Sequence, residues 1–177
     1  MASVLAFAGS NSSTSVNFKL VKYTSSLIND HDLELLNMAS ITFPMYSEDR
    51  EKQLGFPDAL VKLKEKIEKA DALIISVNEH NSAPSSYFKN VLDWLSRANR
   101  NYLENTKVFL MSASPGKRGG ISAREYLSES LPRTGGIVVA TFSLPSFYTN
   151  FNEEHGIIDT DLSKAHTKAL ERFISEL

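Results

Sequence analysis

The sequence contains no cysteine, and this absence removes several classes of chemistry at once. Disulfide bonds, thiolate metal sites and a cysteine nucleophile are excluded, so any redox reaction depends on a bound cofactor. The four histidines are scattered without the spacing of metal ligands, and we expect no metal site. No G-x-S-x-G elbow is present either, and we predict no catalytic acid, base or nucleophile.

An excess of charge and a long hydrophobic run are also missing. Nineteen lysines and arginines stand against twenty-one aspartates and glutamates, which leaves a net charge of −2 and no polybasic run. This balance argues against a nucleic-acid partner and against binding to a membrane surface. The apolar start, residues 1–9, is short and lacks the charged n-region of a signal peptide, so we expect a cytoplasmic protein.

Short apolar runs alternate with longer segments of helical period, a pattern typical of βαβ units in a parallel sheet. At 177 residues, the chain fits one domain over residues 1–177. The expected strands are 3–8, 32–37, 72–77, 107–112 and 137–142, and the expected helices are 15–29, 57–69, 85–97, 120–131 and 161–177. Right-handed crossovers then give a three-layer α/β sandwich with strand order 2-1-3-4-5.

The longest stretch without a periodic pattern covers residues 38–56 and includes a charged run at 48–52. We predict an irregular loop, which is either a functional segment or a solvated connection. In the functional interpretation, Pro44, Met45 and Tyr46 lie over a neighbouring subunit or a cofactor edge.

The loop after the first strand, residues 8–17, reads A-G-S-N-S-S-T-S-V-N and leads directly into a helix. Its small residues allow close approach, and its hydroxyls, its amides and the helix dipole favour an anion. It is neither a G-x-x-x-x-G-K-[ST] loop nor a G-x-G-x-x-G turn, which argues against ATP or GTP and against a dinucleotide-binding Rossmann domain. A serine-rich helix cap is the alternative, but several hydroxyls at the carboxyl end of a strand favour a phosphate site.

Two later loops carry motifs of their own. Residues 78–94 read N-E-H-N-S-A-P-S-S-Y-F-K-N-V-L-D-W, and residues 112–116 read S-A-S-P-G, with a Gly-Gly pair at 119–120. Together with the first loop they resemble the NAD(P)H-dependent FMN reductases and the related quinone, chromate and azo reductases. The family patterns are G-S-x-R-x-x-S-x-N, P-E-Y-N-x-x-x-P-x-x-L-K-N-x-x-D-W and S-x-S-P-G followed by G-G. The matching residues of the first two are Gly9, Ser10, Ser15, Asn17, Glu79, Asn81, Lys89, Asn90, Asp93 and Trp94, and Pro84 stands one position before the proline of the pattern.

This resemblance implies a flavodoxin-like fold, an FMN cofactor, NADPH or NADH as co-substrate, and a small-molecule electron acceptor. It also implies a homodimer or a homotetramer. The first loop would hold the FMN phosphate, and the later two would lie on either side of the isoalloxazine ring. The expected cofactor-binding residues are Ser10, Ser12, Ser15, Val16, Asn17, Asn78, Glu79, His80, Asn81, Ser114, Pro115, Gly116 and Gly119.

Three of the departures from the family patterns concern residues expected at the flavin. Ser12 replaces an arginine, His80 replaces a tyrosine and Asn78 replaces a proline. Less charge then balances the phosphate, and an imidazole beside the ring would make flavin affinity depend on pH. Two alternatives stay open: an electron-transfer flavodoxin, or a regulatory domain that has lost its flavin. The mild charge and the absence of a T-x-T-G-x-T loop argue against the flavodoxin.

Charged and aromatic residues beside these motifs have other interpretations. Lys117 and Arg118 either meet a phosphate of the nicotinamide dinucleotide or face solvent. Asp93 and Trp94 are expected to pack and to anchor their helix, without a catalytic role.

Overall fold

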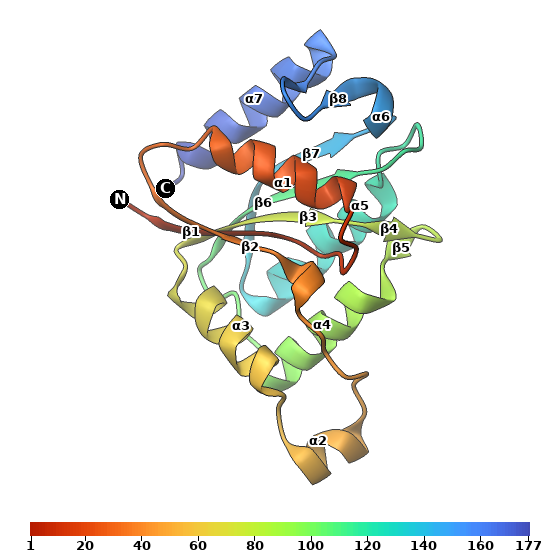
Figure 1. Cartoon of the computed structure of the whole chain (residues 1–177). Helices are drawn as coiled ribbons and strands as arrows, with labels where there is room; N and C mark the ends of the chain where they lie inside the picture. The colour runs from red at the N-terminus through yellow and green to blue at the C-terminus, as the bar shows by residue number, and fades with distance from the viewer.

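The centre of the computed structural model, which describes all residues from 1 to 177, is a five-stranded parallel sheet (Figure 1). Its strands are β1 (Ser3–Ala8), β2 (Asp32–Leu36), β3 (Ala72–Val77), β6 (Lys107–Ala113) and β7 (Ile137–Leu144). Their order is β2-β1-β3-β6-β7, which is the predicted order 2-1-3-4-5. The flavodoxin-like α/β fold is thereby confirmed, with strand ends within two residues of those expected.

Helices cover both faces of the sheet (Figure 1). One face carries α1 (Val16–Ser26) and α7 (Thr160–Ile174), and the other carries α3 (Asp58–Lys69), α4 (Ser86–Ala98) and α5 (Ile121–Ser130). Because strands β1, β3 and β6 are buried on both faces, their sequences are almost continuously apolar. No helix is long and apolar enough to span a membrane.

Several short elements were not predicted. They are η1 (Met38–Ser40), α2 (Glu48–Leu54), η2 (Leu131–Thr134), α6 (Phe147–Asn150), and the hairpins β4 (Glu79–His80) with β5 (Ala83–Pro84) and β8 (Phe151–Asn152) with β9 (Gly156–Ile157). The prediction of an irregular loop over 38–56 was wrong at α2. The hydroxyl of Ser47 caps this helix by accepting from Arg50 N, and acidic residues fill its first turn.

The segment from 43 to 56 is bound to α4 by specific hydrogen bonds. Asn90 Nδ2 and Trp94 Nε1 both donate to the Pro44 carbonyl, at 3.0 and 2.8 Å. Tyr46 N donates to Asn90 Oδ1 at 2.8 Å, and the Glu51 carboxylate accepts from Tyr46 and Arg97. The motif residues Asn90 and Trp94 therefore anchor this arm, although α2 itself extends away from the sandwich (Figure 1).

Candidate functional site

The three predicted loops meet at one edge of the sheet, because parallel strands all end there. The loop at residues 9–15 follows β1, the β4–β5 hairpin follows β3, and the loop at 114–120 follows β6. In Figure 1 the hairpin extends past the end of the sheet, beside α5.

The first loop presents hydrogen-bond donors without any cation. Ser15 caps α1 by accepting from Phe18 N at 3.2 Å, and Ser10 Oγ accepts from Ser12 N at 3.3 Å. The backbone N–H groups of Val16 and Asn17, in the first turn of α1, have no acceptor within the protein. These free donors and the neighbouring hydroxyls are the groups that a phosphate requires.

Gly9 is required by packing under the same loop. A Cβ atom at this position would lie 2.4 Å from Cγ of Phe88, a buried ring of α4. The carbonyl of Gly9 accepts from Ser85 Oγ at 3.2 Å, which ties the first loop to the start of α4. The loop therefore lies directly on the core.

Asn17 connects its own helix α1 to two strands through its side chain. Its Oδ1 accepts from Ser76 Oγ and from Ala113 N, both at 2.8 Å, and its Nδ2 donates to the Ala113 carbonyl at 3.0 Å. Only 3% of the residue is exposed. The amide thus holds the ends of β3 and β6 against α1, and a phosphate contact by Asn17 stays a prediction for its free backbone N–H.

The β4–β5 hairpin is linked to the third loop by a carboxylate. Glu79 Oε2 accepts from Ala123 N at 3.0 Å, in the first turn of α5. The helix has no cap of its own, because its N-cap residue is Gly120. Asn81 and Ser82 form the hairpin tip with φ angles of 52° and 61°, as both central residues of a type I′ turn do. His80 and Asn81 are exposed at this tip.

The third loop rests on a segment that the sequence analysis missed. Phe147 N and Ser146 N donate to the carbonyls of Ser114 and Gly116, at 3.0 and 2.9 Å. A Cβ atom on Gly119, whose φ is +62°, would lie 2.8 Å from Pro145 N, so the two segments touch. The position of residues 145–147 after the fifth strand was the available signal, since all parallel strands end at this edge.

Comparisons with known proteins identify the family of this chain. The family model described as NADPH-dependent FMN reductase matches residues 2–149. The chain belongs to this family. It is 32% identical over 129 residues to an NAD(P)H-dependent FMN reductase of Pseudomonas aeruginosa, covering 72% of this chain and 68% of the relative. It is 31% identical to a quinone reductase of Escherichia coli, covering 63% of this chain and 60% of that relative.

Solved structures show the same fold at lower identity. The flavoenzyme NAD(P)H:acceptor oxidoreductase of Paracoccus denitrificans aligns over 99% of this chain and 96% of its own, with a TM-score of 0.78 and 23% identity. An FMN-dependent NADH-azoreductase of Bacillus anthracis, solved in complex with FMN, aligns over 99% of both chains with a TM-score of 0.63 and 15% identity.

The residues at the carboxyl edge fit the flavin of this family by their chemistry. Neutral donors surround the first turn of α1, and the exposed Pro115 and Gly116 leave a backbone surface without bulky side chains. One buried acceptor, Asn78 Oδ1, has no hydrogen-bond partner within the protein. Lys117 and Arg118 are exposed, and Arg118 donates to Ser122 Oγ at 3.1 Å.

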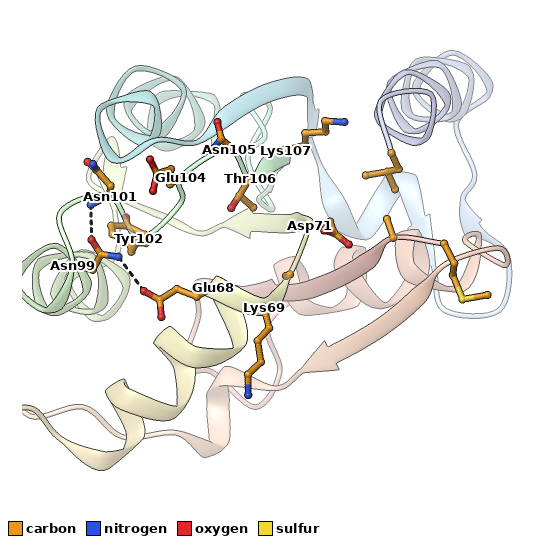
Figure 2. Close-up of a pocket in the computed structure, with 14 residues that line it drawn as sticks. Glu68, Lys69, Asp71, Asn99, Asn101, Tyr102, Glu104, Asn105, Thr106 and Lys107 are labelled. Carbon is orange, nitrogen blue, oxygen red and sulfur yellow. Dashed lines mark hydrogen bonds between the residues drawn. The ribbon is translucent and has the colours of Figure 1, made fainter.

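A cavity of about 620 Å³ lies at the opposite edge, where the strands begin (Figure 2). Its polar walls are partly satisfied internally: Glu68 accepts from Asn99 Nδ2 at 3.0 Å, and Asp71 accepts from Ser3 N at 2.8 Å. No group of three or more acidic, histidine or cysteine residues is arranged to hold a metal ion. In an open α/β sheet the ligand lies at the carboxyl ends of the strands, so this cavity is not the flavin candidate.

Proposed function

We propose that this protein is an FMN-dependent NAD(P)H oxidoreductase whose acceptor is a small molecule such as a flavin, a quinone or an azo compound. One observation carries the proposal: three family motifs meet at the carboxyl edge, where Asn17 and Glu79 fix their relative positions. The names of its relatives, an FMN reductase, quinone reductases and an azoreductase, support the substrate class.

The phosphate of FMN would be held by the first loop. Its donors are the N–H groups of Val16 and Asn17 and the hydroxyls of Ser10, Ser12 and Ser15. Because this loop has no cation, the phosphate depends on neutral hydrogen bonds and on the positive end of the α1 dipole.

The ring would lie between the hairpin at 78–81 and the loop at 114–119. When bound, FMN would supply the hydride-transfer chemistry between NADPH or NADH and the acceptor. The protein contributes orientation: Glu79 holds the hairpin to α5, and the segment after β7 supports the loop at 114–116. No side chain of the site is assigned as an acid, a base or a nucleophile.

We further propose a cytoplasmic homodimer or homotetramer. Three apolar side chains around α2 are exposed, with 70% of Met45, 69% of Leu54 and 39% of Phe56 accessible. Apolar groups gathered on a projecting arm support a contact between subunits. Sedimentation of the protein and of Leu54→Glu tests this association.

The proposal is tested by titrating the apoprotein with FMN and following flavin fluorescence, then adding NADPH without oxygen. We expect saturable binding and bleaching of the yellow absorption band. The variant Ser12→Arg is expected to bind FMN about tenfold more tightly, because it places a cation beside the phosphate. Riboflavin, which has no phosphate, should bind both proteins equally.

Two other outcomes would point elsewhere. No binding at tens of micromolar FMN would favour a regulatory domain without flavin. Binding of FMN without NADPH-dependent bleaching would favour an electron-transfer carrier of the flavodoxin type, which receives electrons from a protein partner.

A further inference from the structure

One buried polar atom at the carboxyl edge lacks a partner. Asn78 follows β3, and its side-chain oxygen Oδ1 is fully buried but accepts no hydrogen bond. Its backbone carbonyl is satisfied, because it accepts from Ser85 N at 3.2 Å. Buried acceptors are nearly always paired in native proteins, so an unpaired one in a binding region calls for an explanation.

The neighbours of Asn78 show which side of the sheet its side chain faces. Side chains alternate along a strand. Val77 belongs to the core under α4, and Glu79 reaches α5 on that same face. Ser76 points the other way and donates to Asn17 of α1. The side chain of Asn78 therefore lies on the face of the sheet that α1 covers. The first turn of α1, with its free N–H groups, lies on this same face.

We propose that Asn78 Oδ1 accepts a hydrogen bond from bound FMN, which rests on the proposed function. A flavin offers two kinds of donor for a buried acceptor, the N3–H of the ring and the hydroxyls of the ribityl chain. The unpaired oxygen destabilises the free protein, and the bound flavin supplies the missing hydrogen bond. Asn78 is thus a binding residue whose side chain is poorly satisfied until the ligand arrives.

Two opposite effects of one substitution test this inference. Asn78→Ala should raise the dissociation constant for FMN about tenfold, since one hydrogen bond to the ligand is lost. The melting temperature of the same variant without flavin should stay equal or rise, because the unpaired buried oxygen is gone. Asn78→Leu, which removes the polar atoms and keeps the volume, should behave in the same way.

The chain offers a matched control in Ser25. Its hydroxyl is also buried without a partner, and it lies in the last turn of α1. At a rise of 1.5 Å per residue, this is roughly 14 Å along the helix from the free N–H groups of its first turn. Ser25→Ala should raise the melting temperature without flavin and leave FMN affinity unchanged.

The outcomes separate this inference from the proposed function. Native binding of FMN with unchanged affinity in both Asn78 variants would overturn the inference alone, as would a fall in the melting temperature of both apo variants. Absence of FMN binding by the native protein would overturn both. Lumiflavin, which has no ribityl chain, identifies the donor. If the Asn78 variants lose as much affinity for lumiflavin as for FMN, the donor is the ring N3–H. If they lose no affinity for lumiflavin, the donor is a ribityl hydroxyl.

Discussion

The two faces of the sheet are stabilised by different means. The face under α3, α4 and α5 buries a cluster of 21 apolar residues, with Trp94 and Phe88 among the largest. The face under α1 and α7 buries 18 apolar residues, but it also contains hydrogen-bonded Asn17, Thr24 and His166. Apolar packing stabilises without direction, whereas hydrogen bonds fix particular atoms in place. On the face that bears the first loop, these directional contacts tie the strands to α1, whereas on the other face Asn90 and Trp94 bind the α2 arm.

The largest loss of stability is expected from a cavity on the face under α3, α4 and α5. Phe88→Ala should lower the free energy of unfolding by about 3 to 5 kcal/mol, as deletion of a buried phenyl ring does. Phe173→Ala, which removes a fully buried ring of α7, should cost a similar amount. Because Gly9 rests on Phe88, only the first variant should also weaken FMN binding. Equal FMN affinities in the two variants would contradict the role of Phe88 as a support of the first loop.

Acid should lower the free energy of unfolding through one histidine on the face under α1 and α7. His166 is 1% exposed, and burial lowers its pKa to about 4 from the ordinary 6.5. The unfolded chain therefore binds a proton more readily, and the stability that neutral His166 contributes above pH 6.5 is lost as the pH falls to 4. This loss should be roughly 3 kcal/mol, measured by urea unfolding at successive pH values.

His166→Phe is the control for the acid effect. Thr24 Oγ1 donates to the Leu20 carbonyl at 2.9 Å, so the hydroxyl keeps a partner when the imidazole is removed. The variant should lose most of the decline between pH 6.5 and 4. An unchanged decline would assign the acid sensitivity to other groups.

Two buried asparagines lie on opposite faces of the sheet. Their variants compare hydrogen bonds beside the candidate flavin site with hydrogen bonds that have only a structural role. Asn17→Ala and Asn90→Ala should each lower the free energy of unfolding by about 2 kcal/mol, since the first leaves Ala113 N without its acceptor and the second leaves Tyr46 N without its acceptor. Only Asn17→Ala should reduce FMN affinity, because Asn90 holds the α2 arm. A matching loss of affinity in Asn90→Ala would mean that the arm takes part in the flavin site.

The smallest effect is expected outside both faces, at the tip of the β4–β5 hairpin. Ser82 has a φ of 61°, a conformation that glycine adopts without strain. Ser82→Gly should raise the free energy of unfolding by about 1 kcal/mol. Asn81→Gly should gain less, because asparagine tolerates this region better. The melting temperatures of the two variants give their order of stability. A lower melting temperature of Ser82→Gly would refute backbone strain at Ser82.

Local pattern was sufficient to predict most of the fold. The apolar runs of β1, β3 and β6 and the 3.6-residue period of α7 depend only on neighbouring residues, and each is found within three residues of its predicted end. The α2 helix was missed because it has no buried face, and so its sequence has no apolar period to detect.

What the sequence alone determined was the strand order, the family and the three loops that carry its motifs, since each is written in a contiguous stretch. Only the tertiary structure decided how those loops are held. Asn17 meets Ala113 across 96 residues, Glu79 meets Ala123 across 44, and residues 145–147 support the loop at 114–116. Such contacts depend on the distance between elements after the sheet has formed, and no local pattern of residues encodes that distance.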